Sequence, residues 1–547
     1  MRATLLALAL LATEFTSFAI KEPDFPVWAL RYPNAGGALV DAAGNSYTTT
    51  SPTTITNSFH VTKFTPEGHV AWSTRLEENT YGVFPGAMIV DPAGNVYISG
   101  SNYKLFANGN PQDFLTWKLD ANGNLLWRAL YDPPDGTDDS PNGIGRDDAG
   151  NLYVVGRSYS YNLQVAYSTT LKYDSDGHLL WARRYEGATN SIPNNTGTLA
   201  VNPHGGVAAI TPAAIASYSA EGELLWSRQA PLFNDAPPSG FDADDHLFVV
   251  SVRWDTPVSP ILDQVRHTTL TKFSPQGDIL WAAEEHGPVK ESLYPKDLKI
   301  DALGQAYLAG DSPISCYRYY DDGEWDLNCY EQPAIVKYSP EGEQLWTSRF
   351  SFPTNLFPFV AGLALNSAGE PYLSAAVYYF DSAADDYGSH QGFVAKCDVS
   401  GNQVWSGTYD ASQFRALLFF GAPASDALGN LFASAELNFS HAPDSAEIDL
   451  LLLKFQPFRP NPAPEIVTPP QAQTIEAPGA TVTFSVTASG AGQLSYQWRF
   501  NSQPIAGANA ATLMFPAVQA TQAGDYSVEV RNKFGSIVTP EVGLSFR

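Results

Sequence analysis

Two short phrases recur along this chain of 547 residues, and their repetition limits the possible folds more than any single residue does. The first phrase is Asp-x-x-Gly-Asn-x-Tyr, which begins at Asp41, Asp91 and Asp147 and returns five more times in related copies. The second consists of Lys, an aromatic residue or Leu, three residues, Gly, three residues and Trp, as in 118–127. Self-similarity at a nearly constant interval is the sequence signature of a repeat architecture.

Each repeat unit contains four short segments of strand-forming residues. In the first unit these are GALV, SYTTT, HVTKF and VAWSTRL, and turns rich in Gly, Asp, Asn and Pro separate them. In the turn at Asp41, we expect the carboxylate to bond back to the backbone and Gly44 to take the left-handed position. One copy has Asp245 at the Gly position, and Asp tolerates that conformation better than most residues. Four antiparallel strands per unit, repeated radially, predict the blades of a β-propeller.

The first phrase occurs eight times, which predicts an all-β, eight-bladed β-propeller. Seven blades is the alternative, if the short unit around Asn202 does not form its own blade. We favour eight, because that unit keeps four strand segments and its own Trp226. The last unit has Lys454 but no Trp after it, whereas Trp28 stands alone near the start. The strands around these two residues are therefore expected to pair and to remove an exposed sheet edge.

Seven tryptophans recur once per unit, at intervals of 45 to 65 residues. We interpret them as structural residues that pack between neighbouring blades: Trp72, Trp127, Trp181, Trp226, Trp281, Trp346 and Trp405. The repeated Lys is expected to pair with an acidic or carbonyl group near a turn.

The two phrases together resemble the unit of the bacterial β-propeller repeat proteins known as SBBP repeats. The resemblance covers about residues 26–456, and a more distant one relates the chain to propellers of the pyrroloquinoline-quinone type. It implies the architecture of the segment and leaves the activity open, because such scaffolds carry many functions.

The two ends of the chain differ from the repeats. Residues 1–19 contain the apolar run LLALALLA and small residues before position 20, which is typical of a secretory signal peptide. A Pro-rich stretch, 457–470, is expected to be a semi-rigid linker. No later segment is long and apolar enough to span a membrane. We therefore expect a secreted, extracellular or cell-surface protein without membrane insertion, with the periplasm as the alternative compartment.

Residues 471–547 resemble bacterial immunoglobulin-like domains, which implies a β-sandwich. Trp498 is expected in its core and Tyr526 at the tyrosine-corner position. Val486 and Val528 stand where many members of this class have a disulfide, so packing must replace that cross-link.

Charge and cysteine content restrict the partners. The net charge of −26 argues against nucleic acid, because nucleic-acid binding requires a basic patch. We expect a disulfide between Cys316 and Cys329, and closing that loop would contribute about 3 kcal/mol in the chain-entropy model. Cys397 is expected to be a small buried hydrophobe.

Loop length predicts which face of the propeller binds a partner. The connections between the second and third strands, and between blades, all emerge on one face, and they are long and variable, whereas the opposite face carries short turns. Aromatic rings with polar acceptors suit an extracellular glycan or protein. The candidate ligand-binding residues are Tyr317, Tyr319, Tyr320, Trp325, Tyr378, Tyr379 and Tyr387. The alternative is that these rings only cover the surface of the blades or pack loop against loop.

Local signatures of catalysis are absent from the sequence, which has no His-Glu-x-x-His, Gly-x-Ser-x-Gly or phosphate-binding Gly loop. We name no catalytic residue and expect no cofactor. The Asp-rich loop after Asp132 has oxygen ligands that suit calcium, but its spacing is not that of an EF-hand.

The main hypothesis for the function is a monomeric binding or adhesion scaffold. The alternative is a propeller hydrolase or lyase acting on extracellular polysaccharide, with carboxylates supplied by different blades. A water-accessible pocket with clustered charged groups of perturbed pKa would favour the enzyme.

Overall fold

The structure is a computed structural model that describes residues 28–33, 35–50, 57–103, 112–133, 138–160, 163, 165–186, 198–211, 214–229, 238–254, 265–286, 292–321, 324–353, 356–381, 386–410, 417–426, 430–438, 448–455, 464–489, 494–532 and 535–547. The chain divides into two compact units, Met1–Pro457 and Phe458–Arg547, and both are built from β-strands. The predicted signal peptide, 1–19, lies outside the described residues.

The described residues of the first unit form eight sheets, which we number in chain order. Sheet 1 comprises β2 (Ala35–Val40), β3 (Ser46–Thr50), β4 (Ser58–Phe64) and β5 (Val70–Glu77), and sheet 2 comprises β6 (Gly82–Val90), β7 (Val96–Tyr103), β8 (Gln112–Leu119) and β9 (Leu125–Tyr131). Sheet 3 comprises β10 (Asp138–Arg146), β11 (Leu152–Ser160), β12 (Val165–Tyr173) and β13 (Leu179–Glu186), and sheet 4 comprises β14 (Thr198–Val201), β15 (Val207–Ile210), β16 (Ala214–Tyr218) and β17 (Leu224–Gln229).

Sheet 5 comprises β18 (Ser239–Phe241), β19 (Leu247–Trp254), β20 (Arg266–Phe273) and β21 (Ile279–Glu285), and sheet 6 comprises β22 (Tyr294–Ile300), β23 (Ala306–Asp321), β24 (Glu324–Tyr338) and β25 (Gln344–Arg349). Sheet 7 comprises β26 (Leu356–Leu365), β27 (Pro371–Asp381), β28 (Asp386–Cys397) and β29 (Gln403–Asp410). Sheet 8 joins both ends of the unit, with β30 (Leu417–Phe420), β31 (Ala424–Ser425), β32 (Leu431–Asn438), β33 (Ile448–Phe455) and β1 (Trp28–Pro33).

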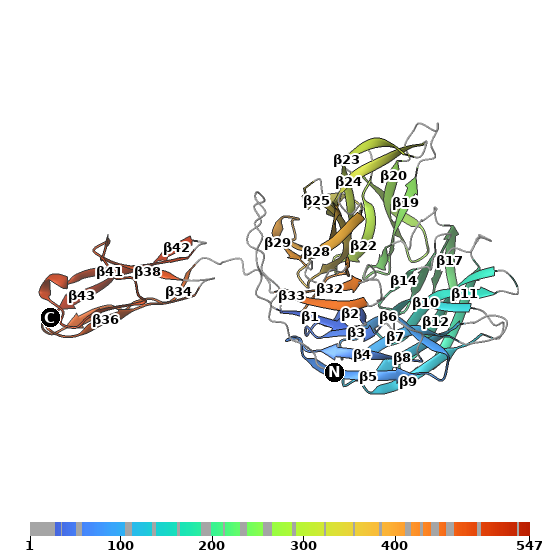
Figure 1. The fold of residues 1–547 in the computed structure, drawn as a ribbon, viewed down its shortest axis with the longest axis horizontal. Coiled ribbons are helices and arrows are strands. Elements are labelled where there is room, and N and C mark those ends of the chain that lie inside the picture. Colours follow the sequence, from blue (N-terminus) through green and yellow to red (C-terminus); the bar gives the residue numbers. More distant parts are fainter. Residues whose placement is uncertain are drawn as a thin grey trace. The chain divides into compact units, whose positions relative to one another are not determined.

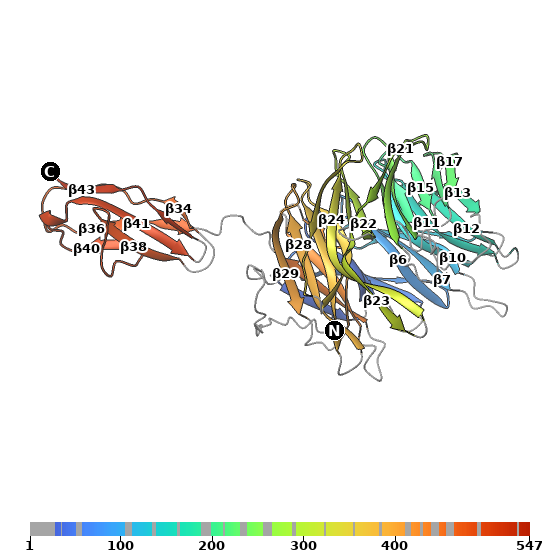
Figure 2. The ribbon, with the colours of Figure 1, turned by 90° about the horizontal axis from the view of Figure 1, so that it is seen from above.

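Neighbouring strands within each sheet are antiparallel, and Figure 1 shows the sheets following one another around the unit in chain order. Each sheet contacts the next, and sheet 8 contacts sheet 1 through β32 and β33 against β2. Figure 2 shows the same strands from above. In sheet 8, Trp28 lies directly opposite Lys454, which confirms the predicted pairing of the two ends.

The repeated turns have the predicted geometry. The Oδ1 atom of Asp41 accepts hydrogen bonds from the backbone N–H groups of Ala43 and Asn45, at 3.0 and 2.8 Å. Gly44 has a φ of +82° and donates its N–H to the Asp41 carbonyl. Asp245 takes the corresponding position with a φ of 62°, as its residue type allowed. The phrase Asp-x-x-Gly-Asn therefore fixes the hairpin between the first and second strands of a sheet.

The core of the first unit consists of apolar layers between consecutive sheets. Between sheets 1 and 2, for example, Val61 packs in one cluster with Leu115 and Trp117, and all three are fully buried or nearly so. Seven of the clusters each join two neighbouring sheets in this way. Each sheet therefore depends on its neighbours for a buried face.

The second unit is a β-sandwich of the immunoglobulin type. Its elements are β34 (Glu465–Thr468), β35 (Gln473–Ile475), β36 (Val482–Ser485), β37 (Thr487–Ser489), β38 (Ser495–Phe500), β39 (Gln503–Pro504), β40 (Thr512–Phe515), the 3-10 turn η2 (Ala520–Gln522), β41 (Gly524–Asn532), β42 (Gly535–Val538) and β43 (Val542–Phe546). Trp498 is fully buried, in one cluster with Val486 and Val528. The Tyr526 hydroxyl donates to the Gln522 carbonyl at 2.8 Å, so the predicted tyrosine corner is confirmed.

One expectation about the first unit needs correction. The segment around the two predicted disulfide cysteines was expected to be a loop, but it forms strands β23 and β24, of 16 and 15 residues. The segment after Val377 likewise continues as β27 and β28. Backbone pairing continues because Tyr, Phe and Val in these segments favour strands, and no turn phrase interrupts them. None of the described residues forms a helix that is long and apolar enough to cross a membrane.

Candidate functional sites

A polar cluster recurs where the first turn of a sheet meets the third strand. In sheet 3, the Tyr153 hydroxyl donates to Oδ2 of Asp147 at 3.1 Å, and Lys172 Nζ lies 5.0 Å from the centre of the Tyr153 ring. Lys172 also donates to the carbonyl of Ala220, in the next sheet, at 2.8 Å. The same carbonyl accepts the Trp181 indole N–H at 3.0 Å. The prediction that the repeated Lys pairs with a carbonyl near a turn is confirmed, whereas the role of the Tyr was missed.

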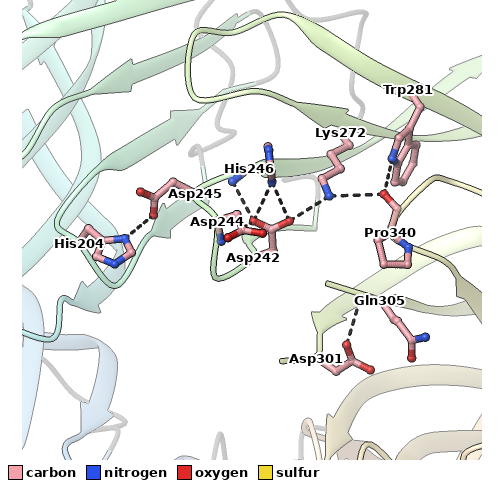
Figure 3. Close-up of polar contacts among 10 residues, drawn as sticks. All are labelled: His204, Asp242, Asp244, Asp245, His246, Lys272, Trp281, Asp301, Gln305 and Pro340. Carbon is pink, nitrogen blue, oxygen red and sulfur yellow. Dashed lines mark hydrogen bonds and ion pairs between the residues drawn. The ribbon is translucent and has the colours of Figure 1, made fainter. Parts of the chain in front are cut away.

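Sheet 5 contains a variant of this cluster, which Figure 3 shows. Asp242 lies between Lys272 and His246, with Oδ2 at 3.0 Å from both Lys272 Nζ and His246 Nδ1. Burial alone would raise the pKa of Asp242, but hydrogen bonds from His246 and Lys272 outweigh it and lower the pKa. Lys272 and Trp281 both donate to the carbonyl of Pro340, at 3.4 and 2.8 Å. The Lys272 ammonium group therefore binds Asp242 in its own sheet and the Pro340 carbonyl in sheet 6.

The repeated tryptophans lie on the turns of the following sheet. A Cβ atom placed on Gly177 would come within 2.6 Å of Cδ2 of Trp127, whose Nε1–H donates to the Ser175 carbonyl at 3.0 Å. The same arrangement pairs Trp72 with Gly123, Trp181 with Gly222, Trp226 with Gly277, Trp281 with Gly342 and Trp346 with Gly401. Trp405 lies 6.3 Å from the Phe455 ring, and its Nε1 has no hydrogen-bond partner among the described residues.

Sheet 4 has lost this cluster. Asn202 replaces the Asp, Gly206 the Asn, Ala208 the Tyr, and Ser217 the Lys, so each replacement is smaller, uncharged or both. A cavity of about 200 Å³ lies there, between sheets 4 and 5. We call it the sheet 4–5 cavity; its lining consists of Asn202, His204, Gly206, Ser217, Tyr218, Leu225, Trp226, Phe241, Asp245, Leu247, Ser274 and Pro275.

Polar groups and aromatic rings share the wall of this cavity. His204 Nδ1 donates to Oδ1 of Asp245 at 2.8 Å, and this hydrogen bond raises the pKa of His204. The Pro275 carbonyl accepts the Trp226 indole N–H at 3.1 Å, as the repeat pattern requires. Asn202 uses Oδ1 to accept the N–H of Gly206. The cavity lies beside the short turns, on the face opposite the one predicted to bind.

Sequence reasoning missed this cavity, although a signal was present. The unit around Asn202 loses the Asp and the Lys of its phrases together, which indicates that these two residues interact. The simultaneous loss of the Tyr, at Ala208, completes the pattern. The sequence pattern does not show whether side chains of the neighbouring sheet fill the space that the missing Asp, Tyr and Lys leave.

Buried charges also lie between sheets 5 and 6. The Arg266 guanidinium stands 5.7 Å from the Trp254 ring and 5.3 Å from the Tyr294 ring. It donates to the Ser292 carbonyl at 2.8 Å and to Oε1 of Glu331 at 2.7 Å. This arginine therefore links the start of β20 to β24 through a charge-assisted hydrogen bond.

A buried carboxyl lies nearby on β23. Burial raises the pKa of Asp311 to about 7; the Val360 N–H and the cations Lys296 and Arg266 offset the rise only in part, and the Glu331 carboxylate adds to it. Its Oδ1 accepts the Val360 N–H at 2.7 Å, and Oδ2 lies 3.8 Å from Lys296 Nζ. Asp311 is 1% exposed, so it offers almost no surface to a substrate.

The structure places the predicted ligand-binding residues on two hairpins. Tyr317, Tyr319 and Tyr320 belong to β23 and Trp325 to β24, with Tyr320 directly opposite Trp325. Tyr378 and Tyr379 belong to β27, and Tyr387 to β28. Of these seven side chains, only that of Tyr378 is described, and its ring packs edge-on against Phe359 at 5.4 Å. A binding role for these residues stays a prediction.

Of the three cysteines, Cys316 and Cys329 remain candidates for a disulfide, whereas Cys397 is free. Cys316 lies directly opposite Cys329 in the β23–β24 register, and their pairing as a disulfide stays a prediction. Cys397 is free and buried, and burial raises the pKa of its thiol to about 11. A thiol with so high a pKa is unreactive at neutral pH.

Within the described ranges, no group of three or more His, Cys, Asp or Glu side chains is placed to hold a metal ion. Residues 134–137 of the Asp-rich loop lie outside those ranges, so calcium binding there is untested.

The strand pairings and the repeated clusters define an all-β repeat protein with a C-terminal immunoglobulin-like sandwich. Comparison with family models agrees with this class: residues 135–164 match the model described as a beta-propeller repeat (SBBP), and residues 463–532 match an immunoglobulin domain. The resemblances to SBBP repeats and to immunoglobulin-like domains are thereby confirmed. A comparison with curated proteins found no match.

Several solved structures are similar at low identity. The polysaccharide lyase Uly1 shares 10% identity, with 80% of this chain and 94% of that chain covered and a TM-score of 0.40. The exotype rhamnogalacturonan lyase YesX shares 13% identity, with 80% and 75% covered and a TM-score of 0.35. A protein of unknown function from Bacteroides caccae shares 14% identity, with 69% and 94% covered and a TM-score of 0.32. Because these TM-scores are low, the description of the fold rests on the strand pairings.

Proposed function

We propose that this chain is a secreted or cell-surface binding protein that recognises a glycan or a protein. In this proposal the eight sheets are the blades of an eight-bladed β-propeller, which β1 closes, and a Pro-rich linker at 457–470 leads to the immunoglobulin-like domain at 471–547. Residues 1–19 act as a signal peptide for export, and the exported protein is a monomer. The ligand is uncharged or cationic, because a net charge of −26 repels anions.

The observation that carries the proposal is a two-stranded ribbon, formed by residues 312–321 and 324–332, that extends beyond its sheet. Strand β22 pairs with β23 only as far as Asp311, and β25 pairs with β24 only from Ala334 onward. The ribbon between these points, near the top of Figure 1, carries four of the seven candidate aromatic residues. Aromatic side chains on a projecting support can bury a large area at low entropic cost.

The base of the ribbon is held by two contacts. Glu331 accepts a hydrogen bond from buried Arg266, and the Tyr330 ring stacks on Phe357 with 6.2 Å between centres and 18° between planes. Such anchoring reduces the flexibility that a partner would otherwise have to remove on binding. It favours the ribbon as a binding element over a simple cover for the sheet.

A hydrolase or lyase acting on extracellular polysaccharide is the second candidate function. Asp311 favours it, because a carboxyl group with a pKa near 7 can exchange a proton at neutral pH, and Lys296 lies beside it. Burial opposes it, because Asp311 is 1% exposed and bonded to the Val360 N–H. The burial of Asp311 therefore makes catalysis the weaker of the two candidates.

The test is a glycan-array screen of the mature protein, followed by titration of the strongest ligand. Replacing Trp325 or Tyr379 with Ala is expected to weaken binding roughly tenfold and to leave Tm unchanged, because in this proposal each ring contacts the ligand and does not support the fold. Leu303→Ala serves as the control, because Leu303 is 75% exposed in a short turn of the same unit. Unchanged affinity in both aromatic variants would reject the ribbon face, and release of unsaturated or shortened sugars would replace binding with catalysis.

A disulfide between Cys316 and Cys329 is part of the proposal. Directly opposite residues of an antiparallel pair lie about 4.5–5.5 Å apart at Cα, within the range that a disulfide spans. When unreduced protein is denatured and its thiols are alkylated, mass spectrometry is expected to find one blocked cysteine, Cys397. Finding two or three blocked cysteines would remove the disulfide from the proposal.

A further inference from the structure

We propose that the sheet 4–5 cavity binds the primary ammonium group of a ligand, in the position that the chain's own lysine occupies in other sheets. The repeats themselves supply the comparison. In sheets 2, 3 and 5, one backbone carbonyl accepts both a Lys ammonium and a Trp indole N–H: the carbonyls are those of Ser175, Ala220 and Pro340. The fold therefore contains, several times, a site already shaped for an alkylammonium group.

Sheet 4 keeps the acceptor carbonyl and the tryptophan of this site but lacks the lysine that would donate the ammonium group. The corresponding carbonyl, that of Pro275, still accepts the Trp226 indole N–H at 3.1 Å. The residue opposite Trp226, however, is Ser217, which carries no ammonium group. A carbonyl oxygen has two lone pairs, so Pro275 can accept a second hydrogen bond as its counterparts do. Pro275, Ser217 and Trp226 all line the cavity.

The volume of the cavity fits a short alkyl chain with an ammonium end. At about 200 Å³ it is several times the ~30 Å³ that one water molecule occupies in the liquid. In the intact units the lysine ammonium also lies over an aromatic ring, at 5.0 Å in sheet 3 and 4.9 Å in sheet 5. The sheet 4–5 cavity has Trp226, Tyr218 and Phe241 in its wall, and such rings attract cations.

Charge at the cavity favours a cation when His204 is neutral. Asp245 is the one carboxylate among the described lining residues, and it accepts the hydrogen bond of His204. Protonated His204 would cancel this charge, so the experiment belongs at about pH 8.5. At that pH an alkylamine is still mostly protonated, because its pKa is near the ~10.4 of lysine.

The experiment titrates n-butylammonium into the full chain at pH 8.5, with saturation-transfer NMR as the readout, and n-butanol as the uncharged probe of equal chain length. We expect saturable binding of butylammonium and at least tenfold weaker binding of butanol. Nα-acetyl-lysine amide is the second probe: if it binds and butylammonium does not, the ligand is a peptide lysine rather than a small amine. Equal binding of butanol and butylammonium, or no saturable binding of either amine, would overturn the proposal.

Two variants locate the site. Ser217→Lys restores the lysine of the repeat, so it is expected to reduce butylammonium binding at least tenfold while keeping or raising Tm. Ser400→Lys adds the same charge in an exposed turn of sheet 7 and is expected to leave binding unchanged. Unchanged binding in Ser217→Lys would place the amine elsewhere and reject the site. This inference does not depend on the ribbon, because Trp325→Ala and Tyr379→Ala are expected to keep amine binding intact.

Discussion

Deleting β1 is expected to lower the Tm of the first unit by about 10 °C. The strand forms six residue pairs with β33, from Trp28 opposite Lys454 to Pro33 opposite Asp449. Losing about five hydrogen bonds at ~1 kcal/mol each, with a Tm change of ~2 °C per kcal/mol, accounts for a shift of this size. The deletion also uncovers the edge of a strand whose residues 450–453 are all Leu and all buried, so aggregation is expected as well.

The measurement is differential scanning calorimetry combined with light scattering. A deletion of residues 20–26, which ends before β1, is the matched control and should keep the original Tm. An unchanged transition after removal of β1 would mean that sheet 8 is stable without it, and the pairing of the two ends would lose its structural importance.

Replacing Trp127 with Ala is expected to destabilise the first unit by about 2–3 kcal/mol, below the range for fully buried aromatic side chains, because Trp127 is only partly buried. The indole covers Gly177 of the next sheet and donates to the Ser175 carbonyl, so its loss leaves a gap and removes one of the two hydrogen bonds to that carbonyl; Lys118 still supplies the other. Gly177→Ala is expected to be similarly costly. Its Cβ would lie 2.6 Å from Cδ2 of Trp127, and its φ of +86° disfavours any side chain.

The two changes should be strongly coupled, which chemical denaturation can measure. In the Trp127→Ala background the clash disappears, and Gly177→Ala should cost only the backbone term of about 1–2 kcal/mol. Trp325→Ala, on the ribbon, is the control and should leave the free energy of unfolding unchanged. Additive costs for Trp127 and Gly177 would contradict the contact between them.

The repeated geometry could be predicted from the sequence because its causes are local. An Asp followed by Gly three residues later specifies the turn at Asp41, and the same rule explains the positive φ of Asp245. The pairing of Trp28 with Lys454 was also predictable, because each residue carries half of a phrase whose other half is missing nearby. The immunoglobulin-like core followed from Trp498 and Tyr526 for a similar reason, since their spacing is typical of the class.

Features that depend on contacts between sheets could not be predicted in the same way. The hydrogen bond between Tyr153 and Asp147 lies within one phrase, yet the partner of Lys172 is a carbonyl 48 residues away. The sheet 4–5 cavity depends on whether Phe241 and Leu247, from the next sheet, move into the space that the missing lysine leaves. Sequence periodicity describes a strand and its own sheet, whereas side chains from the next sheet decide what stays open.

The composition of sheet 8 has a consequence for folding during synthesis. Strand β1 is synthesised more than four hundred residues before its partner β33, Ile448–Phe455. During that interval β1 has no native strand to pair with, and non-local pairings of this kind form slowly. A polypeptide cut short before residue 448 would keep β1 unsatisfied and would be open to proteases. The stability of β1 therefore depends on whether the last strands of the first unit have been synthesised.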